Sequence, residues 1–273
     1  MNPFKKTTVS FFKKTIWDYY HSHAREFAWR NVTDPYKVFI SEVMLQQTQT
    51  KRVIEKYEQF LTEFCSFQAL AQASLRDVLS VWQGLGYNRR GKFLHESAQR
   101  IMQEYDGVLP QDPRILVQLP GIGPATAASI CAFVFNSPTV FIETNIRAVF
   151  LHFFFSGKVG VHDKEIIPLV AATVDHSNPR EWYYALMDYG VLLKQTIPNP
   201  SRASKHHATQ SKFIGSNREI RGKVIKALTE KNKLTEQELL QIAQSQEKRL
   251  LGIIKQLCTE NIIKQVGNTF FIP

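Results

Sequence analysis

Residues 119–147 read LPGIGPATAASICAFVFNSPTVFIETNIR, and this stretch decides the fold. Gly121 and Gly123 allow a positive φ and a close approach of another backbone, so they break the preceding helix. Pro124 suits the first turn of a helix, where its missing N–H is not needed. The pattern predicts a helix-hairpin-helix that binds phosphate at the second helix N-terminus, through Gly121, Gly123, Ala125 and Thr126. The alternative is a tight turn between two core helices.

The composition favours a nucleic-acid partner. The 273 residues include 34 Lys and Arg against 24 Asp and Glu, a formal net charge of +10. A chain this basic favours a polyanion, and nucleic acid is the foremost candidate. A generally basic surface without a specific partner is the alternative. The 44% hydrophobic content is sufficient for a core.

The cysteine and hydropathy patterns predict the compartment. Cys65, Cys131 and Cys258 stand far apart and form neither a metal-ligand pattern nor an even set for disulfides, which fits a reducing cytosol. The N-terminal stretch resembles no signal peptide, and no segment reaches the roughly 20 apolar residues of a membrane span. His206 and His207 lack partners at ligand spacing. We expect a monomer without a membrane partner, cytoplasmic, and nucleoid-associated if bacterial.

Apolar residues at helical spacing predict a chain made mostly of α-helices. The expected helices cover residues 9–21, 36–64, 68–82, 94–105 and 114–119, and two more lie in residues 164–193, split by Ser177-Asn178-Pro179. Residues 195–217 are polar with two prolines, which predicts a linker or a loop on the surface.

Residues 217–273 have the pattern of a separate small unit. Three expected helices precede a segment that alternates around Gly267-Asn268, a hairpin signal. Thr235 and Glu238 match a capping box at the start of the second helix. This order is typical of a winged helix, which binds nucleic acid or serves in protein interactions, and the sequence leaves both open.

Two acids lie on segments that flank the predicted hairpin, Glu42 before it and Glu143 after it. A half-buried Glu42 would have a raised pKa and could donate a proton near neutral pH; the alternative is a surface acid that pairs with a lysine. Two acids are the minimum for cleaving a glycosidic bond, one protonating the leaving group and one stabilising or trapping the oxocarbenium-like sugar. In DNA the leaving group is a base that has left the stack. Ala125 cannot form a Schiff base with the sugar, as a lysine there could.

Other side chains near these acids suit a DNA duplex. Gln46 and Gln47 could reach bases or fill a gap in the stack, and Tyr87 could act as a wedge. Arg89 and Arg90 stand at an expected helix start, where cations and N–H groups suit a phosphate backbone. Solvated helix residues are the alternative for this set.

These motifs resemble the helix-hairpin-helix (HhH-GPD) DNA glycosylases, most of all the adenine glycosylases of the MutY type. The resemblance spans residues 8–215 and is carried by WRNVTDPYKVFISEVMLQQTQT (29–50), GLGYNRRGKFLHESA (84–98), LPGIGPATAASI (119–130) and MDYG (187–190). It implies an all-α, two-domain helix-hairpin-helix glycosylase fold with a small C-terminal winged-helix-like unit. The expected domains are a helical domain of residues 1–28 and 136–216, a six-helix barrel domain of residues 29–135, and the unit of residues 217–273.

The resemblance also implies a function and roles for several residues. The chain would be a monofunctional DNA glycosylase of base-excision repair, acting on double-stranded DNA with a mispaired or damaged base. Glu42 would be the general acid, and Trp29 and Arg30 would line the base pocket with it. Gln46 and Tyr87 would enter the stack near the target.

The resemblance bears on bound ions and cofactors too. The hairpin would hold a monovalent cation at the carbonyls of Leu119 and Ile122. The four cysteines that bind an iron–sulfur cluster in the family would fall at Lys194, Ser201, Ser204 and Gln210. Since none of these is a cysteine, no cluster and no other cofactor are expected.

Further departures from the family bear on the substrate. The family's Asp-Gly-Asn triplet is Glu143-Thr144-Asn145 here, and Tyr184 replaces a polar residue that reads adenine. The winged-helix-like unit takes the place of the domain that recognises 8-oxoguanine. Adenine opposite 8-oxoguanine or guanine is the expected target. Another mispaired or damaged base, such as thymine, or a non-catalytic protein that recognises lesions or mismatches, is the alternative.

Overall fold

The computed structural model describes residues 6–210, 212–244 and 247–273. The first five residues of the N-terminal stretch, and the expected start of the third C-terminal helix at residues 245–246, lie outside this range. The chain divides into two compact units. Unit 1 comprises residues 1–38, 111–117 and 123–209, and unit 2 comprises residues 39–110, 118–122 and 210–273.

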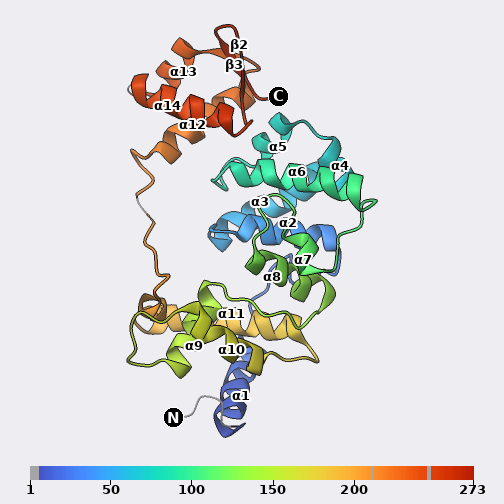
Figure 1. Ribbon diagram of the computed structural model, residues 1–273, viewed down its shortest axis with the longest axis vertical. Helices are drawn as coiled ribbons and strands as arrows, with labels where there is room; N and C mark the ends of the chain where they lie inside the picture. Colours follow the sequence, from blue (N-terminus) through green and yellow to red (C-terminus); the bar gives the residue numbers. More distant parts are fainter. Residues whose placement is uncertain (1–5, 211, 245–246) are drawn as a thin grey trace. The chain divides into compact units, whose positions relative to one another are not determined.

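Unit 1 is built around one long buried helix, α11 (Pro179–Thr196), which packs along α9 (Thr144–Phe154) and α1 (Lys6–His23) (Figure 1). The other helices of this unit are α7 (Pro113–Leu116), α8 (Pro124–Phe135), α10 (Asp163–Thr173) and the 3-10 helix η1 (Pro200–Ala203). The predicted break at residues 177–179 is confirmed, because Asn178 caps α11 through its side chain and Pro179 occupies the first turn.

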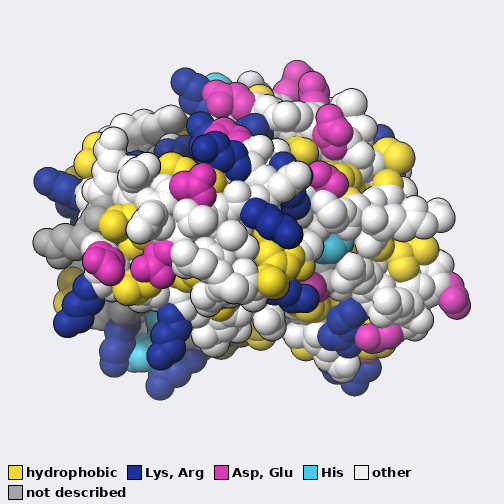
Figure 2. Space-filling view, turned by 90° about the horizontal axis from the view of Figure 1, so that it is seen from above, with side chains coloured by type: hydrophobic (Ala, Val, Ile, Leu, Met, Phe, Trp, Pro, Cys, Tyr) yellow, Lys and Arg dark blue, Asp and Glu magenta, His cyan; other side chains and the backbone are white. Residues whose placement is uncertain are grey.

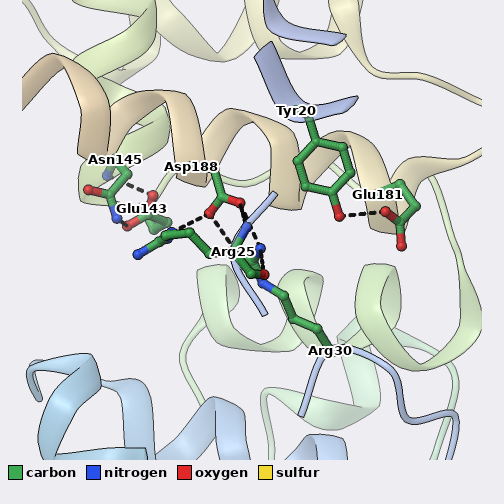
Figure 3. A network of polar contacts seen from close by, with 7 residues as sticks. All are labelled: Tyr20, Arg25, Arg30, Glu143, Asn145, Glu181 and Asp188. Carbon is green, nitrogen blue, oxygen red and sulfur yellow. Dashed lines mark hydrogen bonds and ion pairs between the residues drawn. The ribbon is translucent and has the colours of Figure 1, made fainter. Parts of the chain in front are cut away.

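A buried carboxylate fixes the segment that follows α1. Both oxygens of Asp188 accept from the guanidinium of Arg30 at 2.7 Å, and Arg25 donates from its Nε at 2.6 Å and its backbone N–H at 2.9 Å (Figure 3). The Asp188 side chain is fully buried. Burial works to raise the pKa of Asp188, but Arg30, with Arg25, outweighs it and holds that pKa below its usual value. The ion pair therefore ties residues 25–30 to α11.

One glycine sets the approach of α11 to α9. A Cβ at Gly190 would lie 2.5 Å from the backbone oxygen of Asn145, in the first turn of α9. No larger residue fits without displacing a backbone, so the two helices come together at this point because position 190 carries only a hydrogen.

Hydrogen bonds hold the segment after α11, which the sequence predicted as a linker or surface loop. The Ser201 hydroxyl donates to the carbonyl oxygen of Thr144 at 3.3 Å. Val161 donates its N–H to Ala203 at 3.0 Å and accepts from the N–H of Lys205 at 2.9 Å. The loop thus lies against α9 and the chain before α10.

Unit 2 contains α3 (Thr50–Glu63), α4 (Phe67–Gln72), α5 (Leu75–Val81) and α6 (Arg89–Glu104), together with most of α2 (Pro35–Leu45). The predicted single helix over residues 36–64 is wrong: Gln47 has a φ of 53°, and Gln49 begins α3 as its N-cap. The predicted helix over residues 68–82 is also divided, because the Ser74 side chain accepts from the N–H of Asp77 and starts α5. Hydrophobic periodicity runs through both breaks and does not show them.

The C-terminal segment has the predicted winged-helix order. Its helices are α12 (Asn217–Glu230), α13 (Glu236–Ala243) and α14 (Glu247–Thr259). Strands β1 (Leu234–Thr235), β2 (Lys264–Val266) and β3 (Thr269–Phe271) form an antiparallel sheet in the order β1-β3-β2. The capping box of Thr235 and Glu238 is present. No helix in the described ranges is long and apolar enough to cross a bilayer.

The two units divide the chain differently from the predicted domains, since residues 29–38, 111–117 and 123–135 of the predicted barrel domain fall in unit 1. Leu75 and Leu79 of α5 share one hydrophobic core with the C-terminal helices, and Arg76 donates to the carbonyl oxygen of Thr229 at 2.8 Å, so residues 217–273 belong to unit 2. Helix α8 belongs to unit 1, where Phe133 stacks on Tyr184 with ring centroids 4.6 Å apart.

Replacing Gly190 by alanine should destabilise the protein. The added Cβ meets the backbone of Asn145, and we expect the free energy of unfolding to fall by about 1–3 kcal/mol. Gly222 in α12 has no atom within 4 Å of the same added group, so G222A should instead gain about 0.5–1 kcal/mol. Denaturant titrations of both variants measure the difference, and equal behaviour of the two would contradict the close approach at residue 190.

Replacing Asp188 by asparagine should cost about 3–5 kcal/mol at neutral pH, because the buried guanidinium of Arg30 loses its counter-charge. The folded-state pKa of Asp188 lies below the unfolded value of about 3.9, so its contribution is present above that pH and is lost as the pH falls through the folded-state pKa. The deficit of D188N should therefore shrink in acid below about pH 4. Unfolding titrations at several pH values measure it.

The matched control is D18N, because Asp18 pairs with Lys14 on the surface at 2.6 Å. Such exposed pairs contribute at most about 1 kcal/mol. A D188N deficit as small as that of D18N, or one that stays constant into acid, would contradict the role of Asp188.

Candidate functional site

The predicted site residues are divided between the two units. Unit 2 contains Glu42, Gln46, Gln47, Tyr87, Arg89, Arg90, Leu119, Gly121 and Ile122, and unit 1 contains Trp29, Arg30, Gly123, Ala125, Thr126, Glu143 and Tyr184.

The three residues predicted to line a base pocket in unit 1 lie together. The guanidinium of Arg30 lies 4.5 Å from the ring centroid of Tyr184 and 5.1 Å from that of Phe27. The Trp29 ring stacks on the same Phe27 ring, with ring centroids 4.9 Å apart. Asp188 fixes Arg30 between these rings, and sequence reasoning did not single it out as a site residue. The sequence did contain a sign of this role, because Asp188 is an acid inside a helix that is apolar nearly all round, and acids are rarely buried without a partner.

Glu143 is the N-cap of α9. Its Oε1 accepts from the backbone N–H groups of Asn145 at 2.6 Å and Ile146 at 2.7 Å, and its Oε2 accepts from the Asn145 side-chain amide at 3.3 Å (Figure 3). A carboxylate at this end of a helix satisfies N–H groups that have no partner within the helix and faces the positive end of the helix dipole. The longer acid at this position is therefore held in one place and is half-buried.

Glu42 lies in the last part of α2, within unit 2. Its side chain is half-buried, and its neighbours Ser41 and Val43 are buried. The sequence left open whether Glu42 is half-buried or a surface acid, and the structure has it half-buried. The proton-donor role of Glu42 stays a prediction.

The hairpin turn is braced from within unit 2. Gly121 has a φ of 74°, and a Cβ there would lie 2.9 Å from the Phe93 ring. The Gln46 side-chain amide donates to the Gly121 carbonyl at 3.2 Å, and the Ser97 hydroxyl donates to the Pro120 carbonyl at 3.1 Å. The turn thus requires glycine at position 121.

The two hairpin glycines differ. Gly123 has a φ of −85° and nothing within 4 Å of an added Cβ, so the expected positive φ applies to Gly121 alone. Gly123 is the N-cap of α8, and it has no side chain that could cap the helix. Both Gly123 and Ala125 are exposed. The Leu119 carbonyl, one of the two expected cation ligands, accepts the N–H of Ile122 at 3.2 Å.

Arg90 points into unit 2. Burial lowers its pKa to about 10. Its guanidinium donates over 2.7–3.2 Å to the Thr48 hydroxyl and to the carbonyl oxygens of Val43, Met44, Leu85 and Gly86. Arg90 therefore joins the end of α2 to the turn before α6. Its neighbour Arg89, by contrast, has a half-exposed side chain.

The C-terminal segment contacts the predicted wedge turn. Tyr87 has a φ of 47°, and its hydroxyl accepts from Gln210 and from Arg218. Arg89 pairs with Glu260, which also pairs with Arg221. Burial works to raise the pKa of Glu260, but the two arginines outweigh it and hold that pKa below its usual value.

Figure 2 shows Lys and Arg side chains in several groups, with acidic side chains also exposed. Among the described residues, no group of three or more His, Cys, Asp and Glu side chains is placed to hold a metal ion. The side chains at all four expected cluster positions form hydrogen bonds. Lys194 donates to Asn145 at 2.8 Å, and the Ser204 hydroxyl accepts from the N–H of His206 at 3.0 Å. Ser201 donates to the Thr144 carbonyl and Gln210 to the Tyr87 hydroxyl, as described above.

Comparison with known proteins agrees with these motifs. Residues 40–168 match the HhH-GPD superfamily base excision DNA repair protein model. The adenine DNA glycosylase of Buchnera aphidicola subsp. Baizongia pistaciae (strain Bp) is 33% identical over 192 residues, which are 68% of this chain and 54% of that protein. That of Mycobacterium tuberculosis (strain ATCC 25618 / H37Rv) is 39% identical over 132 residues, 48% of this chain and 43% of that protein. The chain spans about half the length of the curated relatives it matches.

The fold is shared with a solved structure, that of a thermostable thymine-DNA glycosylase. The TM-score is 0.63 at 21% identity, over 71% of this chain and 91% of that chain. The predicted all-α helix-hairpin-helix fold is thereby confirmed. The chain thus contains, in residues 40–168, a domain of the HhH-GPD superfamily of base excision DNA repair proteins.

Proposed function

We propose that this protein is a monofunctional DNA glycosylase that removes a mispaired base, adenine opposite 8-oxoguanine or guanine, from double-stranded DNA. The observation that carries the proposal is that two acids suited to this chemistry, half-buried Glu42 and the helix-capping Glu143, both lie within the segment that matches the superfamily. The names of the curated relatives support adenine as the base. The protein acts as a monomer, cytoplasmic and nucleoid-associated if bacterial, without an iron–sulfur cluster or other cofactor.

In the proposed reaction the two acids divide the work. Glu42 donates its proton to the base, and the bond between C1′ and the base nitrogen breaks with its electron pair passing to the base. Glu143 stabilises the positive charge that develops on the sugar. A water then adds to C1′ and releases a proton, which leaves an abasic site. Because Ala125 has no amine, no Schiff base forms at the hairpin and the strand stays intact.

A second target, another mispaired or damaged base such as thymine, is favoured by one observation. Tyr184 lies under the Arg30 guanidinium and stacks on Phe133, so an aromatic ring occupies a position where the resemblance implies a polar residue. The test below therefore includes duplexes with thymine and uracil.

Single-turnover excision by the wild type and E42Q tests the proposal. The substrates are duplexes with A opposite 8-oxoguanine, A opposite G, T opposite G and U opposite G, treated with alkali to reveal abasic sites. We expect wild-type cleavage on the adenine duplexes and none by E42Q, which should still bind them, because only the proton donor is lost. E55Q, at an exposed position of α3, is the matched control and should cleave at the wild-type rate.

Either of two results decides against adenine excision. Wild-type cleavage confined to T or U opposite G would assign the second target. No cleavage on any duplex, with tight binding retained, would favour the non-catalytic protein that recognises mismatches.

Variants of Arg89 and Arg90 should distinguish a residue that binds phosphate from one that stabilises the fold. If a phosphate replaces Glu260 at Arg89, Glu260 keeps Arg221 as its partner, so the exchange leaves no buried carboxylate unpaired. We expect R89Q to weaken DNA binding and to lower the slope of log affinity against log salt by about 1. R90Q should instead lower the unfolding midpoint, since Arg90 donates inside the protein. Binding titrations over a salt series and denaturant titrations measure both, and an unchanged slope for R89Q would argue against phosphate contact.

A further inference from the structure

Lys194 reaches the residue that holds Glu143. It lies near the end of α11, and its Nζ donates to the side-chain oxygen of Asn145 at 2.8 Å. The same asparagine binds Glu143 twice, through its backbone N–H at 2.6 Å and through its side-chain amide at 3.3 Å. A chain of contacts therefore runs from Lys194 through Asn145 to the carboxylate.

The chemistry of this chain fixes the orientation of the amide. An ammonium has three donors and no acceptor, so it can bond only the oxygen end of Asn145. The nitrogen end is then left for the Oε2 of Glu143. Without Lys194 the amide could turn over, and its oxygen would face the carboxylate oxygen in place of a donor.

The backbone brings Lys194 to this position. Gly190 lies four residues before it, on the same face of α11, and allows that face to approach Asn145 so closely that a Cβ would lie 2.5 Å from its backbone oxygen. Arg147, another cation near Glu143, is engaged by Asp163 at 2.6 and 2.7 Å. Lys194 is thus the cation that bonds the Asn145 side chain.

The environment of Lys194 is unusual for a lysine. Its side chain is half-buried, and burial lowers the pKa of the ammonium below its usual value, with Glu143 acting in the opposite direction and Arg147 in the same one. A lysine that served only solubility would keep its ammonium in water.

We propose that Lys194 is a positioning residue for Glu143, acting through Asn145. This inference rests on the proposed function, in which Glu143 stabilises the charge on the sugar. Two departures from the family pattern, the longer acid at position 143 and the lysine at position 194, then meet at one asparagine and act as one unit.

Single-turnover excision, with duplex affinity measured beside it, tests the inference in the full-length protein. K194M has a similar side-chain length without a donor and should slow excision by about tenfold to a hundredfold, because a misplaced carboxylate stabilises the sugar less well. Its DNA affinity should stay within about twofold of the wild type, since only the reacting centre changes. K194R keeps charged donors and should recover most of the rate. K164M, at an exposed lysine of α10, is the matched control and should be unchanged.

The same change in an N145A background shows whether Lys194 acts through Asn145. We expect K194M to have no further effect on the rate there. A wild-type rate for K194M would overturn the inference, and so would an equal loss in the N145A background or a loss of DNA affinity that matches the loss of rate.

A second measurement separates this inference from the proposed function. If the wild type excises no base from any duplex, the proposed function fails on its own. The shift of the denaturant midpoint caused by K194M, compared in wild-type and N145A backgrounds, then tests the contact. A smaller shift in N145A supports the Lys194–Asn145 bond, and additive shifts overturn it.

Discussion

The pairing of Asp188 with Arg30 and Arg25 is the interaction on which unit 1 depends. A carboxylate removed from water is tolerated only when other charges and donors surround it, and Asp188 accepts four hydrogen bonds from these two residues. The segment of residues 25–30 therefore has one place to lie against α11. The orientation of Arg30 over Tyr184 and Phe27 follows from that ion pair.

Glu143 has a structural role beside the chemical role that we propose for it. As the N-cap of α9 it satisfies two backbone N–H groups, and loss of such a cap typically costs about 1 kcal/mol. A substitution at this position would thus change stability and chemistry together, and activity lost on mutation is interpretable only beside a stability measurement. Glu260 in unit 2 likewise has two partners, because its carboxylate pairs both with Arg89, beside the turn of Tyr87, and with Arg221 of α12.

Local sequence signals predicted the elements well and their breaks poorly. The Pro179 start of α11, the Thr235 capping box and the hairpin turn at Gly121 each follow from the type of residue that stands at the turn or helix end itself. The break at Gln47 was missed because the apolar spacing continues on both sides of it, and no Gly or Pro marks the left-handed residue. The packing of residues 217–273 on Leu75 and Leu79 could not be predicted locally, because those two residues lie far away in the sequence.

The sequence by itself determined the helical class and the family motifs, because these depend on residue type and short-range spacing, and it supplied the two acids of the proposed reaction as candidates. Only the tertiary structure decided which polar groups meet. Arg90 faces inward rather than toward solvent, Asp188 holds Arg30, and Lys194 meets Asn145, since each contact joins residues about 40 to 160 positions apart. Such pairings depend on how the helices pack. The close packing at Gly190 depends on both α11 and α9, which are separate segments of the sequence.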